Sequence, residues 1–198
     1  LNSTMMKYFL SVAVAAFLTA GTVSAQHVNI GVKGGLNLYN IHNDRGPSND
    51  TKIGFHVGLL GHIHLARQLA FQPELVFSLQ GAKYTVAGVD TKLNLNYVNV
   101  PLLLQYMFDN GFRLQAGPQV GFLISAKSGV GDNDTDVKSS LKTVEFGLGA
   151  GMGYVNPATG FGIDVRYNFG LSNINEDDVI TSTNRGVQIG VFYLFGHQ

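Results

Sequence analysis

The stretch from Ile53 to Lys83 decides the fold of this chain, and it reads IGFHVGLLGHIHLARQLAFQPELVFSLQGAK. From Ile53 to Leu65 every odd position except Gly61 is apolar, whereas the even positions carry glycine, histidine and one leucine. After a break at 66–68, the alternation resumes from Leu69 to Leu79. A period of two over about a dozen residues, twice in succession, predicts two long antiparallel strands. Their uncharged face suits a membrane-spanning β-barrel, in which about 9–11 residues of each strand cross the hydrocarbon.

The composition favours the same class of protein. The chain has 198 residues, enough for one domain, and only 13% of them are charged, against about 25% in ordinary soluble domains. It contains 25 glycines and no cysteine, and its formal net charge is zero. A neutral chain lacks the basic footprint of a nucleic-acid-binding protein, so no nucleic-acid partner is expected. The missing cysteines fit an exported protein.

The N-terminal residues predict a cleavable signal peptide. Lys7 supplies the positive charge, Tyr8 to Ala20 is a largely apolar run, and Val23-Ser24-Ala25 is a small-residue cleavage site. The predicted division is therefore residues 1–25 as extension and signal peptide, and residues 26–198 as the mature barrel domain. An uncleaved membrane anchor is the alternative, although the apolar run is short for a transmembrane helix.

Eight alternating segments in the mature chain predict an all-β fold, an eight-stranded antiparallel up-and-down transmembrane β-barrel. Their connections are alternately short and long, and the long ones are polar. Bacterial outer-membrane barrels show this pattern, with short turns facing the periplasm and long loops facing outside. The expected strands are approximately 28–39, 53–65, 69–83, 92–108, 111–126, 141–155, 160–173 and 185–195.

The fourth segment changes phase along its length. Leu93, Leu95 and Tyr97 occupy odd positions, whereas the apolar residues from Val98 to Tyr106 occupy even positions. The phase change predicts a β-bulge near Tyr97, and Pro101 nearby fits an irregular position.

Six charged residues fall on the inward parity of the predicted strands. A soluble lipocalin-like barrel would reverse the faces, but its outer surface should then be rich in lysine and glutamate. Here the polar face is mostly glycine and amide with balanced charges, which is typical of a tightly filled interior. We therefore predict a structural cluster of polar and charged side chains that plugs the lumen: Lys33, Glu74, Arg113, Glu145, Asp164 and Arg166.

The segment from Tyr97 to Tyr106, YVNVPLLLQY, resembles a signature of the PorT-like, porin-related outer-membrane β-barrel family. GVKGGLN at 31–37 is similar to the first strand of that family, and GPQVGF at 117–122 to its fifth. Asn99 and Gln105 depart from the pattern, because the family often has glutamate and lysine at these two positions. The resemblance implies location and fold, and it raises a role in protein secretion by analogy only.

No motif in the sequence indicates catalysis. His56, His62 and His64 share a strand face, but no further ligand completes a metal site locally, and polar filling of the lumen is expected instead. Asp132, Asp134 and Asp136 alternate in one long loop without the glutamate of a calcium-binding loop, which favours solvated surface charge. No nucleophile elbow or phosphate loop is present, so neither enzymatic activity nor a cofactor is expected.

The sequence therefore predicts a small integral outer-membrane protein of a Gram-negative bacterium, with a structural or interaction role performed by its extracellular loops. A narrow porin-like channel for small solutes and an accessory factor in secretion are the alternatives. The expected partners are outer-membrane lipid and lipopolysaccharide, and the barrel-assembly machinery during insertion. The protein itself is expected to be a monomer.

Overall fold

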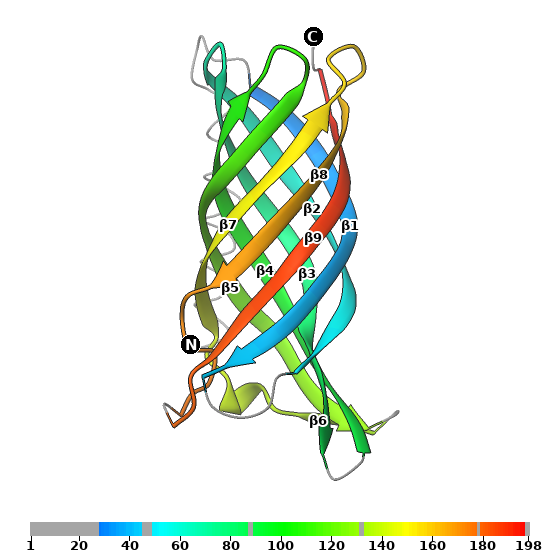
Figure 1. Ribbon diagram of the computed structural model, residues 1–198, viewed down its shortest axis with the longest axis vertical. Helices are drawn as coiled ribbons and strands as arrows, with labels where there is room; N and C mark the ends of the chain where they lie inside the picture. Colours follow the sequence, from blue (N-terminus) through cyan, green and yellow to red (C-terminus); the bar gives the residue numbers. More distant parts are fainter. Residues whose placement is uncertain (1–27, 45–48, 87–88, 131–132, 178, 197–198) are drawn as a thin grey trace.

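The chain folds into one closed, strongly tilted β-barrel (Figure 1). The structure is a computed structural model and describes residues 28–44, 49–86, 89–130, 133–177 and 179–196. The predicted signal peptide and the boundary after residue 25 lie outside the described residues. The strands are β1 (Val28–Asn43), β2 (Asp50–Ala66), β3 (Leu69–Val86), β4 (Val89–Met107), β5 (Phe112–Val130), β6 (Asn133–Asp136), β7 (Val144–Val155), β8 (Phe161–Gly170) and β9 (Ser182–Leu194), with one 3₁₀ turn, η2, at Lys138–Ser140.

Eight long strands close the barrel, and each pairs with its neighbours in an antiparallel ladder. The sheet order is β4-β3-β2-β1-β9-β8-β7-β5-β6, and an additional β4–β5 pairing completes the ring. The first and last strands pair from Gly31↔Leu194 to Asn43↔Ser182. The predicted eight-stranded antiparallel barrel is confirmed, because the short β6 pairs only with the end of β5 and does not enter the ring.

Apolar and polar residues alternate along the sequence because successive residues of each strand face the outside and the inside of the barrel in turn. On β8, for example, residues alternate strictly between exposed and buried from Phe161 to Gly170. Large apolar side chains such as Ile53, Ile163 and Phe146 are half or more exposed on the outer face, at 65%, 54% and 56%. Arg166, Glu74 and Gln72 are 1% or less exposed on the inner face. The barrel is therefore apolar outside and polar inside.

Among the described residues, no helix is long and apolar enough to cross a membrane.

The phase of β4 differs from the prediction. Odd positions face inward from Leu95 to Gln105, so that Leu95 and Tyr97 are fully buried inside the barrel and do not face outward. The register shift does lie at Asn96/Tyr97, but the extra residue is on β5, where Asn96 pairs with Ser125 and Tyr97 with Leu123. The apolar residues of β4 change face because the interior itself is apolar at this end.

The long connections are mostly continuations of the strands. β3 and β4 remain paired out to Val86↔Val89, and β5 and β6 form a second extended hairpin. Figure 1 shows these extensions together at the lower end, with the short β2–β3, β4–β5 and β7–β8 turns at the upper end. We call these the loop end and the short-turn end. β1 starts and β9 finishes at the short-turn end (Figure 1).

Candidate functional site in the barrel interior

A cluster of four ion-paired side chains crosses the middle of the barrel. Lys33 Nζ on β1 lies 3.4 Å from Glu74 Oε2 on β3 and 3.1 Å from Asp164 Oδ2 on β8. Arg166 on β8 donates to Glu74 through Nη1 at 2.9 Å and Nη2 at 2.8 Å. The side chains of all four residues are no more than 2% exposed. We call these residues the lumen quartet.

Glycines on the intervening strands make room for the quartet. Gly58 of β2 lies between Lys33 of β1 and Val76 of β3 in the pairing registers. Gly190 of β9 pairs with Asp164, so that no β9 side chain intervenes at that row. On β7, a Cβ at Gly149 would lie 3.1 Å from Arg166 Cδ, so the glycine-rich inward parity leaves room for a quartet side chain there.

The quartet balances its own charge. Two cations and two carboxylates share one buried site, and Gln72 Nε2 adds a hydrogen bond of 2.7 Å to Glu74 Oε1. Attraction between such groups is strong where water is excluded, and it offsets the large penalty for removing each charge from solvent. The arrangement braces β1, β3 and β8 against one another.

The other two predicted cluster residues also lie inside the barrel, and Arg113 lies in the same row as Asp164, with Gly153 between them. Arg113 is 1% exposed, and its guanidinium lies 4.0 Å from the ring centroid of Phe192. Glu145 lies beside Tyr97 and Asn184, nearer the loop end. Within the described part of the chain, neither residue forms an ion pair.

A layer of uncharged polar side chains lies between the quartet and the loop end, and His56 is the member of it that was predicted from the sequence to fill the lumen. Asn37 donates to Ser78 Oγ at 2.9 Å, and its Oδ1 lies 2.8 Å from His56 Nδ1. Gln80 forms hydrogen bonds with both Ser78 and Asn184. These residues share the inward parity of their strands, which is the signal that could have identified them.

Apolar clusters occupy the interior on either side of the polar layers. At the short-turn end, Leu60, Val155, Phe192 and Leu194 pack together. At the loop end, a larger cluster lies beneath the mouth of the barrel. It comprises Ile41, Ala82, Leu95, Tyr97, Leu123, Ala126 and Ile174. The lumen is thus filled by side chains in successive apolar, charged, amide and apolar layers.

Among the described residues, the histidines and loop carboxylates make local contacts. The rings of His62 and His64 stack edge to face at 4.7 Å, and His56 contacts Asn37. Asp136 Oδ1 accepts a hydrogen bond from the backbone N–H of Lys138 at 2.9 Å. In the residues that the structure describes, no three His, Asp or Glu side chains converge on a point.

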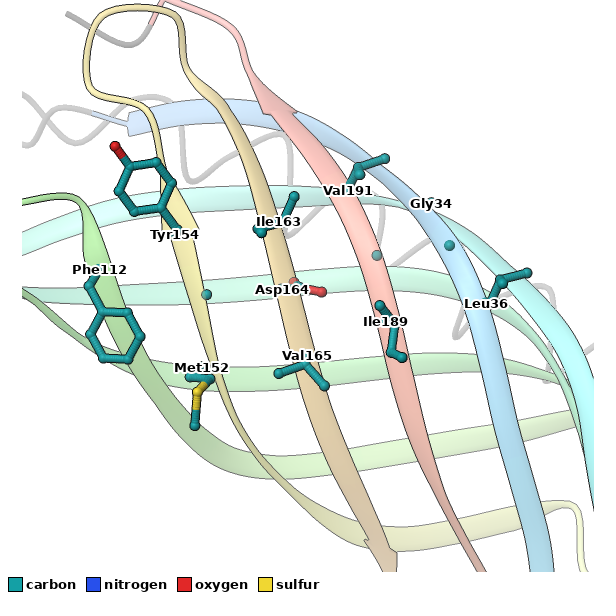
Figure 2. Close-up of a pocket in the computed structure, with 13 residues that line it drawn as sticks. Gly34, Leu36, Phe112, Met152, Tyr154, Ile163, Asp164, Val165, Ile189 and Val191 are labelled. Carbon is teal, nitrogen blue, oxygen red and sulfur yellow. The ribbon is translucent and has the colours of Figure 1, made fainter.

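Two cavities lie outside the filled lumen. One is a groove of about 510 Å³ in the outer wall, where Leu36, Ile189 and Val191 lie around Gly34 (Figure 2). The other is a pocket of about 500 Å³ at the loop end, where the hydroxyls of Tyr84 and Ser128 are hydrogen-bonded at 2.8 Å. The first is apolar, whereas the second mixes hydroxyl, amide and apolar groups.

The fold and its filled interior define a small β-barrel, and comparison with known proteins identifies its family. Residues 24–176 match the family described as "Outer membrane protein beta-barrel domain". The chain belongs to this family, and it is a bacterial outer-membrane β-barrel protein.

Solved structures of outer-membrane proteins share the fold. Neisserial surface protein A is 12% identical with a TM-score of 0.57, and the match covers 84% of this chain and 98% of that protein. The attachment invasion locus protein Ail of Yersinia pestis is 15% identical with a TM-score of 0.50, covering 83% of this chain and 98% of Ail. No curated protein sequence matches the chain.

Proposed function

We propose that this protein is a closed outer-membrane barrel with a structural or interaction role, and that its loop end makes the contacts outside the cell. The observation that carries the proposal is the lumen quartet, which joins strands on opposite sides of the barrel between further side-chain layers. An interior of eight strands is just wide enough for side chains to fill. Because the interior is filled, a role in surface interactions is better supported than a role as a channel for solutes.

The loop end is the end that faces outside in this proposal. In bacterial barrels the short turns face the periplasm, and here both barrel-terminal strand ends lie with the short turns. The loop end carries the pocket beside Tyr84 and Ser128, together with apolar side chains such as Val179, which is 77% exposed. Hydroxyl, amide and apolar groups side by side are suited to binding another molecule.

Planar-bilayer recording of the purified protein tests the closed lumen. We expect little or no steady conductance, because apolar and ion-paired layers both block the path. The double variant Tyr97→Gly, Leu123→Gly removes the largest side chains of the loop-end cluster and should stay closed, since the quartet remains. A large and stable conductance from the unmodified protein would contradict the proposal and support a narrow channel.

The PorT-like resemblance of YVNVPLLLQY supports one more specific role, assistance in protein secretion. This role is compatible with a closed barrel, because a secretion factor can act through surface contacts. A deletion strain should then accumulate secreted proteins in the periplasm, and the intact gene should restore their export. Normal secretion in that strain would exclude a role in secretion and would be consistent with the structural or interaction role.

A further inference from the structure

Arg113 is a buried cation without a hydrogen-bond partner in the described part of the chain. It is 1% exposed, and none of its nitrogens, Nε, Nη1 and Nη2, donates a hydrogen bond. The guanidinium lies over the ring of Phe192, 4.0 Å from the ring centroid. Such a contact attracts the positive charge. A guanidinium has five N–H donors, and those of Arg113 are therefore available to a ligand.

The charges around Arg113 do not cancel. Between the lumen quartet and the short-turn end, the buried cations are Lys33, Arg113 and Arg166, and the buried carboxylates are Glu74 and Asp164. Both carboxylates are already paired with Lys33 and Arg166, at N···O distances of 2.8 to 3.4 Å. Three cations and two carboxylates leave an excess of one positive charge, and Arg113 is the cation without an ion pair among the described residues.

Other charged groups lie too far away to remove this excess. Glu145 is on β7, eight positions before Gly153 (145 to 153), and Gly153 is the β7 partner of Arg113. Eight positions along a strand span roughly 26 Å. Arg67 and Asp109 pair with each other at 3.5 Å, and their side chains are 85% and 69% exposed. The excess charge therefore stays inside the barrel, beside Arg113.

Gln115 presents a further donor on the same face of β5. It lies two residues from Arg113, it is 3% exposed, and its Oε1 accepts a hydrogen bond of 2.9 Å from Gln105 Nε2. Gln115 Nε2 has no partner among the described residues. Three buried oxygens are also without a donor there, Gln72 Oε1, Gln105 Oε1 and Asp164 Oδ1, and water can donate to each of them. A cationic fork beside an amide N–H instead favours a ligand that only accepts.

The strand beside Arg113 contributes no side chain to this part of the lumen. The inward positions of β7 facing β5 are all glycine: Gly147, Gly149, Gly151 and Gly153. At Gly153 a Cβ would lie 3.2 Å from Arg113 Nε. The rest of the lumen is filled by side chains, as expected of eight strands. A ligand at Arg113 must therefore be small, and a monatomic ion is only slightly larger than the water molecules that buried polar sites commonly hold.

We propose that Arg113 and Gln115 bind a small monovalent anion of the halide class, chloride in a natural setting, inside the barrel. The ion accepts hydrogen bonds from the guanidinium and from Gln115 Nε2, and its charge cancels the excess of one. A buried charge without a counter-charge is costly, so the bound ion stabilises the folded barrel. The ion can enter while the barrel folds, and the site therefore needs no open path through the lumen.

Anomalous diffraction from crystals grown in sodium bromide locates the ion directly. Bromide replaces chloride in halide sites, and its anomalous signal distinguishes it from water. We expect a bromide peak in contact with the guanidinium of Arg113 in the unmodified protein. Crystals of Arg113→Met should show no peak at that position. A lumen without a bromide peak in the unmodified protein would overturn the proposal and indicate that water alone contacts Arg113.

Urea unfolding from lipid vesicles measures the effect of the ion on stability. The titration compares sodium chloride with sodium gluconate at equal ionic strength, because gluconate is too large for the filled lumen and reports general screening alone. An ion that binds only the folded barrel lowers the ratio of unfolded to folded protein about 100-fold at about 100 times its dissociation constant. The unfolding midpoint should therefore rise with chloride and not with gluconate.

Two variants assign that response to Arg113. Arg113→Met keeps an unbranched side chain without the charge, and its unfolding midpoint should not depend on chloride. Arg67→Gln removes an exposed cation and should keep the full chloride response. Because Arg113→Met removes a buried unpaired charge, it should fold, and heat-modifiable gel mobility checks this before each titration. Equal effects of chloride and gluconate on the unmodified protein, or a chloride response retained by Arg113→Met, would overturn the proposal.

Discussion

Glu74 is the residue on which the filled interior depends most. It accepts hydrogen bonds from both quartet cations and from Gln72, at distances of 2.7 to 3.4 Å. Glu74→Gln preserves the shape of the side chain but leaves Lys33 and Arg166 with only Asp164 as a counter-charge. Breaking a buried ion pair in this way costs about 3–5 kcal/mol. We expect a loss of stability of that size in urea unfolding from lipid vesicles, with Glu176→Gln in an exposed loop as the control. An unchanged unfolding midpoint would show that the quartet does not stabilise the barrel.

Gly81 is the second residue with a specific structural requirement. Its φ of 124° is one that side chains rarely adopt, and a Cβ there would lie against the backbone carbonyl of Leu93. Gly81→Ala should therefore lower the free energy of unfolding by more than about 1 kcal/mol. Gly34→Ala is the matched control, because the nearest atom to its Cβ is 3.5 Å away. Similar stabilities of the two variants would argue against backbone strain at Gly81.

The identity of individual inward residues could be predicted from parity, but their partners could not. Alternation alone placed six charged residues on the inward parity, and five of them, Lys33, Glu74, Arg113, Asp164 and Arg166, are buried. Four of them meet across the lumen, where Gly149 leaves room for the Arg166 side chain, and this depends on the register. Arg113 stacks on Phe192 instead, and a cation–aromatic contact of this kind leaves no pattern in a single sequence.

Among the strands, β4 shows where the alternation rule fails. The rule equates apolar with outward, and Leu95 and Tyr97 break it because the loop end of the lumen holds an apolar cluster. Their parity never changes, and the irregularity belongs to β5 across the ladder. Sequence alone cannot distinguish a bulge from a change in the polarity of the interior. In both cases the apolar residues move from odd to even positions along the strand.

The assignment of the apolar face of β3 to lipid can be tested by substitution. Leu75 lies near the middle of the outward apolar run from Leu69 to Leu79. Leu75→Arg should destabilise the barrel by about 2–4 kcal/mol, the range for arginine at the bilayer midplane. Asn96→Arg, on the outward face of β4 where it pairs with Leu79 at the end of the apolar run, should cost no more than about 1 kcal/mol, because it lies near the interface. Equal effects in vesicle unfolding titrations would contradict the assignment of this face to lipid.

For the whole molecule, the order and pairing of the eight barrel strands followed from the count of segments, whereas the extent of the loop end did not. The polar stretches after Tyr39 and Lys83 were expected as loops, but β1 continues to Asn43 and β3 to Val86. Beyond the membrane both faces of a strand meet water, so the alternation disappears while backbone pairing continues. The short β6 was missed for the same reason, since all four of its residues are exposed.

These extensions give the molecule two unlike ends, and its orientation in the membrane can be measured. The chain has no cysteine, so single introduced cysteines report without background. Val179→Cys lies at the loop end and Ala158→Cys in the short β7–β8 turn, and both positions are exposed. With the loop end outside, a membrane-impermeant maleimide should label Val179→Cys on intact cells. It should label Ala158→Cys only after the outer membrane is permeabilised. The reverse pattern would place the loop end in the periplasm and contradict the proposed contacts outside the cell.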